Sequence, residues 1–262
     1  PSHEATSSSS LYDATTMQSQ IWASTIPLHI THSSSSTPYL IQIPRVSYLP
    51  LLLPRLTSFF GPASSFSYEG ILLKNLPAGL LCDLYQPPLP WHLTLGDGPL
   101  FDIHDTFMNS VKEADFIRNG TAKGIMSMSK ASTTTLWAAV RDNDYTLYST
   151  IQTKLLNPAT PLKHIPLRIY VPSTPSESST LGAYKIVQML ITPVTGNRET
   201  QTLGGALNSV LPSLFPSRRD VILAEPVLHG APLPMRAPLE EVMREAAYAD
   251  GWVHLCVVMV DI

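Results

Sequence analysis

The sequence of 262 residues contains only two cysteines, Cys82 and Cys256, and each lies within a run of apolar residues. A disulfide framework or a thiolate metal site needs more cysteines or closer spacing. Neither cysteine has a basic neighbour in the sequence that would lower its thiol pKa, so a thioester-forming cysteine is not expected. We interpret both as reduced thiols in the core of an intracellular protein.

Charge is also scarce. Charged residues make up 14% of the chain and the net charge is −3, which leaves no bulk basic field for nucleic acid or anionic lipid. Because 44% of the residues are hydrophobic, a sizeable core is expected rather than a disordered chain. Apolar runs such as Leu255–Val260 are far shorter than the ~20 residues that span a bilayer, and the first twenty residues do not resemble a signal peptide. These features predict a cytosolic protein without a nucleic-acid partner.

Sequence motifs for enzyme chemistry are missing. There is no Gly-x-Ser-x-Gly nucleophile elbow, no phosphate-binding loop and no Gly-x-Gly-x-x-Gly fingerprint. The eight histidines are scattered, so no metal, cofactor or catalytic site is expected. The densest acid/base group is Asp102, His104 and Asp105. It fits the start of a helix, and the alternative is a non-standard enzyme site that would depend on His104.

Residues 21–98 show the pattern strand, strand, helix, strand, strand. The helix is expected from near Pro50 or Leu51 to Phe60, because prolines are tolerated in a first helical turn and Gly61 ends the run. This order is that of a ubiquitin-like β-grasp domain. The four predicted strands cover Ile26–Ile30, Tyr39–Ile43, Phe66–Gly70 and Trp91–Leu95.

Residues 1–20 are serine-rich and predict a flexible N-terminal segment. Residues 99–160 change to helical spacing, with one apolar stripe ended by Gly120 and a second stretch that is interrupted at residues 142–144. The first stripe consists of Ile103, Phe107, Val111, Ala114 and Ile117.

Residues 161–262 repeat the first pattern, with a helix that Thr202 should cap. The overall prediction is an α+β protein with two ubiquitin-like β-grasp domains flanking a small helix-rich domain. On pattern alone, unrelated strand–helix–strand folds stay open. The predicted strands here cover Ile165–Val171, Lys185–Ile191, Val221–Leu223 and Trp252–Val260, and a short helix is expected over Pro238–Tyr248.

Lys112 stands out by its position. It lies beside the apolar stripe on a helix flank that should face water, next to Glu113 and Asp115. Such a lysine is not a self-activated nucleophile, and it becomes an acceptor only if a partner enzyme positions and deprotonates its amine. By composition alone, an ordinary solvated lysine is the favoured interpretation.

Seven short motifs change this interpretation, because they occur in one order and spacing from about Trp22 to the C-terminus. Together they resemble the landmarks of the autophagy protein 5 family. The motifs are Pro44-Arg45-Val46-Ser47-Tyr48-Leu49, Tyr68-Glu69-Gly70, Gly79-Leu80-Leu81-Cys82-Asp83-Leu84, Leu89-Pro90-Trp91, Phe107-Met108 with Lys112-Glu113-Ala114-Asp115, Ile165-Pro166-Leu167-Arg168-Ile169-Tyr170, and Thr202-Leu203-Gly204.

The resemblance implies a non-catalytic scaffold of autophagosome formation. Lys112 would form an isopeptide bond with the C-terminal glycine of autophagy protein 12, with the thioester supplied by transient activating and conjugating enzymes. The N-terminal helix of autophagy protein 16 would bind a groove that involves all three domains, and Gly79 and Asp83 are candidate residues of that groove. The conjugate would promote transfer of autophagy protein 8 to phosphatidylethanolamine at the preautophagosomal structure and isolation membrane.

Two points depart from this pattern or lie outside it. Residues 119–135 are rich in Ser, Thr and Gly, so a shorter helical domain is expected there. Membrane contact should be peripheral and salt-sensitive, since it would depend on local basic residues such as Arg218 and Arg219 or on partners.

The alternative function is an adaptor with two ubiquitin-like domains that binds partner helices without being modified.

Overall fold

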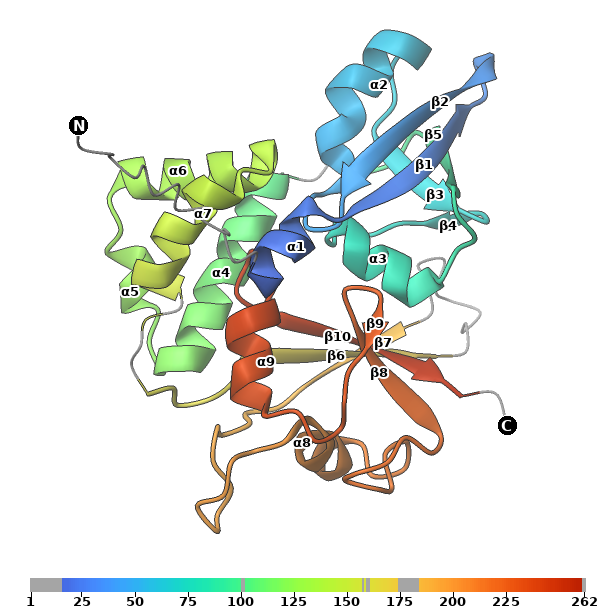
Figure 1. Ribbon diagram of the computed structural model, residues 1–262. Coiled ribbons are helices and arrows are strands. Elements are labelled where there is room, and N and C mark those ends of the chain that lie inside the picture. Colours follow the sequence, from blue (N-terminus) through green and yellow to red (C-terminus); the bar gives the residue numbers. More distant parts are fainter. Residues whose placement is uncertain (1–15, 100–101, 157, 159–160, 174–183, 261–262) are drawn as a thin grey trace, which may run out of the picture.

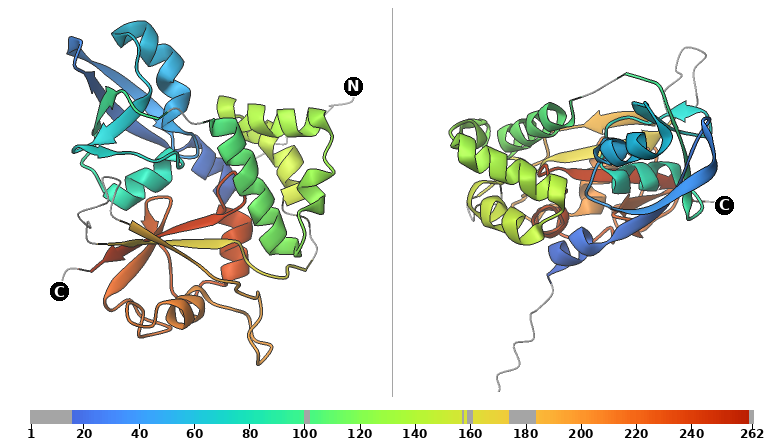
Figure 2. Two further views of the ribbon diagram at one scale, coloured as in Figure 1. Left: turned by 180° about the vertical axis from the view of Figure 1, so that it is seen from behind. Right: turned by 90° about the horizontal axis from the view of Figure 1, so that it is seen from above.

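The computed structural model describes residues 16–99, 102–156, 158, 161–173 and 184–260. Its described part contains two five-stranded sheets with helices packed on them, and a separate group of helices, α4 to α7, beside both (Figures 1 and 2). Each sheet has the same strand order, in which the first and last strands of the domain lie parallel at the centre. This is the β-grasp topology, so the predicted fold class is confirmed.

The first sheet has the order β2-β1-β5-β3-β4. Its inward side chains alternate along β1, where Ile26, Leu28 and Ile30 are buried, as the period-two pattern predicted. The 3-10 helix η1 (Leu49–Leu52) leads into α2 (Leu53–Phe60), so the prolines stand in first turns and Gly61 ends the helix with φ 101°. The strands are β1 Thr25–His32, β2 Ser35–Pro44, β3 Ser65–Tyr68, β4 Ile71–Leu72 and β5 Trp91–Gly96.

Two helices of this region were not predicted. Helix α1 (Met17–Ala23) begins with a Thr16 cap, so residues 17–20 are helical where the sequence predicted a flexible segment. The rest of that segment, residues 1–15, lies outside the described residues. Helix α3 (Ala78–Tyr85) carries Gly79 and Asp83. Its residues are apolar on several sides, a pattern that does not resemble a surface helix.

The second sheet has the order β7-β6-β10-β8-β9. As predicted, the Thr202 hydroxyl caps α8 (Leu203–Val210) by accepting from the Gly205 amide at 3.1 Å. The strand predicted at Val221–Leu223 is wrong, since β8 begins at Ala224, and Val221 and Ile222 are exposed. The other elements are β6 Leu167–Pro172, β7 Tyr184–Gln188, β8 Ala224–Leu228, β9 Ala231–Pro232, α9 Leu239–Ala246 and β10 Val253–Met259.

The helical domain consists of α4 Ile103–Asn119, α5 Lys123–Met126, α6 Lys130–Asp142, α7 Tyr145–Ile151 and the π-helix η2 Gln152–Leu156. Gly120 ends α4 in the left-handed region, as predicted. The interruption predicted at residues 142–144 is also present, because Asn143 ends α6 and the Asp144 carboxylate caps α7. Residues 119–135 contain all of α5 and the start of α6.

The three parts share buried surface. Leu80 of α3 lies in the hydrophobic core of the second sheet, and its carbonyl oxygen lies 3.9 Å from Cys256 Sγ. Trp22 of α1 packs on Tyr148 of α7, with ring centroids 4.6 Å apart. Both cysteines are free thiols. Within the described ranges, each helix is too short or too polar to cross a bilayer.

Candidate functional site

Lys112 lies on the exposed flank of α4, the longest helix of the helical domain. The stripe on the opposite side of α4 is buried at Ile103, Phe107, Val111 and Ala114, which fixes the helix in the molecule. The Lys112 amine donates a long hydrogen bond, 3.5 Å, to Asn109 Oδ1 on the preceding turn. The structure therefore places the predicted acceptor on a rigid element with its amine toward solvent.

The carboxylates beside Lys112 are occupied elsewhere. Glu113 pairs with Arg168 of β6, and the Arg168 guanidinium also lies over the Trp252 ring, 3.9 Å from its centroid. Asp115 is fully buried and accepts from Asn119 Nδ2 at 2.7 Å and the Ile125 amide at 3.1 Å, so its carboxylate is engaged within the helical domain. Among the described residues, the ion pairs do not include Lys112.

A groove of about 490 Å³ runs beside Lys112 between α4 and the edge of the second sheet. Its lining mixes the two side chains of the Glu113–Arg168 pair with apolar surface, and Phe116 is 55% exposed. Solvent-exposed aromatic surface next to a lysine on a rigid helix suits a protein partner better than a small molecule. The lining residues are Lys112, Glu113, Phe116, Ile117, Arg168 and Gln188.

Asp102, His104 and Asp105 form the start of α4, as the capping interpretation predicted. The Asp102 carboxylate accepts from the Asp105 amide at 3.0 Å, and His104 Nδ1 lies 3.2 Å from Asp105 Oδ1. Their ligand atoms lie within 4.8 Å of one another, but all three residues are exposed. The carboxylate of Asp102 is already used as a helix cap, so the cluster has a structural explanation without catalysis.

Gly79 and Asp83 lie on one side of α3, where this helix meets the loop after β2 and the β8–β9 turn. The Gly79 amide donates to the Arg45 carbonyl oxygen at 2.7 Å, and a Cβ added at Gly79 would lie 2.9 Å from that oxygen. Asp83 is 6% exposed and pairs with the Arg45 guanidinium, while its Oδ2 accepts from the Gly230 amide at 3.0 Å. Burial raises the pKa of the Asp83 carboxyl, and Arg45 and the Gly230 amide oppose that shift.

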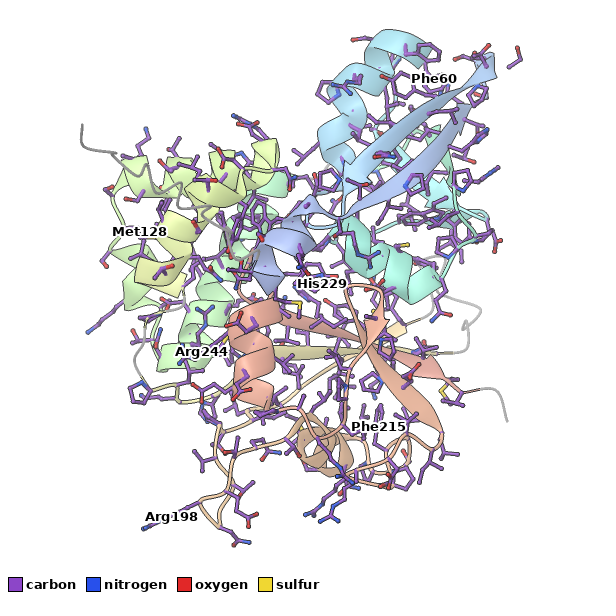
Figure 3. All side chains as sticks on the ribbon, in the orientation of Figure 1. Phe60, Met128, Arg198, Phe215, His229 and Arg244 are labelled. Atoms are coloured by element: carbon purple, nitrogen blue, oxygen red, sulfur yellow. The ribbon has the colours of Figure 1, made fainter. Side chains whose placement is uncertain are left out.

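The β8–β9 turn consists of His229 and Gly230, both with positive φ, at 52° and 81°. His229, labelled in Figure 3, has its Nε2 2.9 Å from the Ala246 carbonyl oxygen of α9. Its ring packs on the Tyr248 ring. Burial lowers the pKa of His229 to about 4, and the nearby Arg45 and His254 act in the same direction against the bond to Ala246. His229 is therefore neutral at physiological pH.

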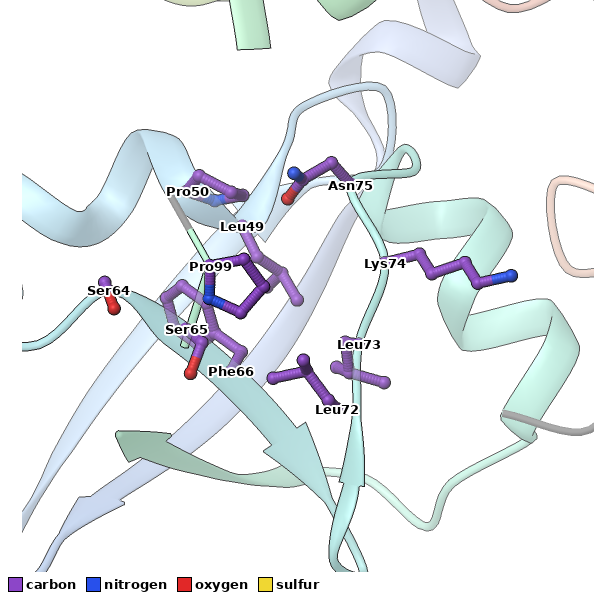
Figure 4. A pocket seen from close by; sticks show the side chains of 10 residues that line it. All are labelled: Leu49, Pro50, Ser64, Ser65, Phe66, Leu72, Leu73, Lys74, Asn75 and Pro99. Carbon is purple, nitrogen blue, oxygen red and sulfur yellow. The ribbon is translucent and has the colours of Figure 1, made fainter. Parts of the chain in front are cut away.

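A second groove, of about 390 Å³, lies between α1, the β8–β9 turn and α9. Apart from Gln20, Ser24 and His229, the side chains along it are apolar, and Met17 at its edge is 56% exposed. It differs from the small hollow of about 20 Å³ in the first domain, which is large enough for about one water molecule (Figure 4). The residues of the larger groove are Met17, Gln20, Ile21, Ser24, Leu228, His229, Ala231, Pro232, Leu233 and Ala246.

A buried polar network joins α4 to the second sheet, and the sequence did not reveal it. Asp250 Oδ2 accepts from Ser110 Oγ at 2.6 Å and lies 2.9 Å from His254 Nε2, while His254 Nδ1 lies 2.9 Å from the Tyr170 hydroxyl. Burial alone would raise the pKa of Asp250, but His254, Ser110 and the Trp252 amide together hold it below its ordinary value. The one available signal was the spacing of Asp250 and His254 in an otherwise apolar segment.

Comparisons with known proteins cover almost the whole chain. Family models described as the UblA domain, alpha-helical bundle region and UblB domain of autophagy protein ATG5 match residues 21–96, 102–158 and 164–257. Autophagy protein 5 of Sclerotinia sclerotiorum is 66% identical over 94% of this chain and its own full length. The Chaetomium globosum protein is 57% identical over 94% of this chain and 90% of its own.

The fold comparison agrees. The crystal structure of Kluyveromyces marxianus Atg5 superposes with a TM-score of 0.73 over 92% of this chain and 99% of the other, at 20% sequence identity. That identity supports the shared fold only, whereas the fungal relatives and the three domain models establish the relationship by sequence. The chain belongs to the autophagy protein 5 family, and its role is in autophagy.

Proposed function

We propose that Lys112 is the acceptor of autophagy protein 12, joined through an isopeptide bond to that protein's C-terminal glycine. The observation that carries the proposal is the position of its amine, which is exposed on a rigid helix beside a groove and outside the ion pairs of the described residues. The nearest acidic neighbour, Glu113, is held by Arg168. An incoming thioester would therefore meet an amine that forms no ion pair with a carboxylate of the described residues.

The bond formation requires little chemistry from this chain. The conjugating enzyme's thioester supplies the acyl carbon, the Lys112 nitrogen attacks it, the thiolate leaves, and the amine proton goes to solvent or to the conjugating enzyme. What this chain contributes is an oriented amine and a surface that holds the donor. The exposed Phe116 and the Glu113–Arg168 pair along the groove provide apolar and polar contacts for that purpose.

The second groove is the proposed site for the N-terminal helix of autophagy protein 16. Its mostly apolar walls come from α1, the β8–β9 turn and α9, and α1 itself packs on the helical domain through Trp22. An amphipathic helix that inserts apolar side chains into such a groove is a common recognition mode. The three-part assembly would then promote transfer of autophagy protein 8 to phosphatidylethanolamine at the preautophagosomal structure and isolation membrane, as a ligase-like cofactor.

A reconstituted conjugation tests the acceptor role. Activating and conjugating enzymes, ATP and autophagy protein 12 are combined with the wild-type chain, Lys112→Arg, and the control variants Lys123→Arg and Lys130→Arg. The controls are matched because both lysines are exposed at the starts of helices in the same domain. We expect an adduct with the wild type and both controls and none with Lys112→Arg.

Two outcomes would contradict this expectation. An adduct that persists in Lys112→Arg and disappears in a control variant would move the acceptor to that other lysine. A folded wild-type chain that gives no adduct with active enzymes would favour the adaptor that binds partner helices without being modified.

A further inference from the structure

The Arg45 side chain is largely buried between the two ubiquitin-like domains. Its side chain is 13% exposed, and its guanidinium donates to the Gly79 carbonyl oxygen at 3.2 Å and to the Asp83 carboxylate. A Cβ added at Gly79 would lie 2.9 Å from both Arg45 Cβ and the Arg45 carbonyl oxygen. Gly79 is thus required by the close approach of the Arg45 strand end to α3.

Asp83 extends the same contact to the second domain. One carboxylate oxygen pairs with Arg45, and the other accepts from the Gly230 amide in the β8–β9 turn. The Leu228–Ala231 pair closes this two-residue hairpin turn. The Gly230 amide is therefore not used by a hydrogen bond within the turn. A Cβ added at Gly230 would lie 3.2 to 3.3 Å from three atoms of the Arg45 guanidinium, so the turn also packs directly on Arg45.

The same turn forms one wall of the helix-binding groove. Leu228, His229 and Ala231 line the groove, and Gly230 between them is the residue that Asp83 holds. On its other side, the turn is tied to α9 through His229 and the Ala246 carbonyl oxygen. The turn is therefore fixed from two domains, and loss of one attachment would let the wall move without removing any residue of the lining.

We propose that Arg45, Asp83 and Gly230 form an interdomain latch that positions the β8–β9 turn, so that Arg45 and Asp83 set the affinity for the partner helix without contacting it. This inference rests on the proposed helix-binding role of the groove and adds positioning residues to it. It also gives Gly79 and Asp83 a different role from direct pairing with a basic side chain of the partner. Both Asp83 oxygens already have partners within the chain.

The test measures binding of a fluorescent synthetic peptide, the N-terminal helix of autophagy protein 16, to the full chain by anisotropy. We expect Arg45→Met to weaken binding about tenfold, since a mobile wall adds an ordering cost to association. Arg45→Lys keeps the charge opposite Asp83 but not the fork of donors, so a loss of about threefold is expected. The Lys variant also keeps the test usable if Arg45→Met does not fold.

A matched control separates positioning from general destabilisation. Leu95→Ala removes a buried side chain of β5 that does not line the groove, and its peptide affinity should stay within about twofold of the wild type while its unfolding midpoint falls. Hydrogen exchange provides a second readout. Exchange of the Gly230 and Ala231 amides should accelerate at least fivefold in Arg45→Met and stay unchanged in Leu95→Ala.

A double-mutant cycle distinguishes the latch from direct contact. Asp83→Asn is combined with peptides in which each basic residue is replaced in turn by Gln. The latch predicts that the fold-loss of affinity caused by Asp83→Asn and the fold-loss caused by the peptide substitution simply multiply. Coupling of more than fivefold between Asp83 and one basic residue would overturn the proposal, as would unchanged affinity in Arg45→Met. A wild-type chain that does not bind the peptide would overturn the helix-binding role itself and the latch with it.

Discussion

His229 should make the stability of this protein fall between neutral pH and pH 5. Its ring is buried against Tyr248, and burial lowers its pKa from the ordinary 6.5 to about 4 in the folded protein. In the unfolded chain the imidazole regains its ordinary pKa and binds a proton below pH 6.5. The unfolded state therefore takes up more protons in this range, which lowers the free energy of unfolding as the pH falls from 6.5 toward 4.

The size of the effect follows from the two pKa values. At pH 5 the difference between 6.5 and about 4 corresponds to about 2 kcal/mol of stability lost relative to pH 7, through proton linkage alone. Other groups also titrate in this range, so a single curve does not isolate His229. The variant His229→Asn removes the titration and keeps a residue type that tolerates the left-handed conformation at φ 52°.

The assay is urea unfolding followed by circular dichroism at pH 7 and pH 5, for wild type and His229→Asn. The wild type should lose about 2 kcal/mol more than the variant between the two pH values, even though the variant starts from a lower stability. The comparison of two pH differences cancels the packing and hydrogen bond that the substitution removes. Equal pH dependence in both proteins would refute the reasoning, because it would mean that His229 protonates equally in the folded and unfolded states.

Two further predictions concern backbone fit and helix capping. Gly204→Ala should lower the free energy of unfolding by about 3 kcal/mol or more, because the new Cβ would lie 2.2 Å from the Arg218 carbonyl oxygen. In the control variant Gly205→Ala the new Cβ meets only side-chain atoms, so the free energy of unfolding should fall by less than about 1 kcal/mol. Equal losses would contradict the backbone argument. Asp144→Ala should cost about 1 kcal/mol in thermal or urea unfolding, because it removes the acceptor of the Leu147 amide, and exposed Asp142→Ala serves as its control.

Much of the fold could be predicted because its local signals agree with its packing. Strand β1 alternates at period two, α8 carries a Thr cap, and the break after Asp142 has a residue that tolerates the left-handed region beside a capping aspartate. Each of these signals is read within about ten residues. Where the sequence offered them, the structure agrees to within a few residues at the ends.

Two of the wrong or missing predictions depend on contacts between distant parts of the chain. Helix α3 is buried between two domains, so it shows no polar face and no amphipathic period. The strand predicted at Val221–Leu223 was an apolar run on the surface, and the pairing partner that selects a strand is visible only in the sheet.

The candidate site was predictable in position but not in environment. Lys112 could be placed on an exposed helix flank from the apolar stripe alone. The neighbours of Lys112 could not be predicted, because the residue that engages Glu113 is Arg168, 55 positions away, and Asp115 accepts from the Ile125 amide of α5. The role of Asp83 was likewise tied to Arg45 and Gly230, which are 38 and 147 positions distant.

The burial of Leu80 within the core of the second sheet has a consequence for how this chain can be divided. The domain borders predicted from the sequence mark where one fold pattern changes to the next, but a fragment that ends at such a border would not be stable alone. A fragment that begins after residue 160 would expose the apolar sheet face on which α3 lies, and a fragment that ends before it would leave α3 uncovered on the same side. The repeated β-grasp units therefore share one buried face, and neither could be exchanged for a ubiquitin-like domain from elsewhere without redesigning that face.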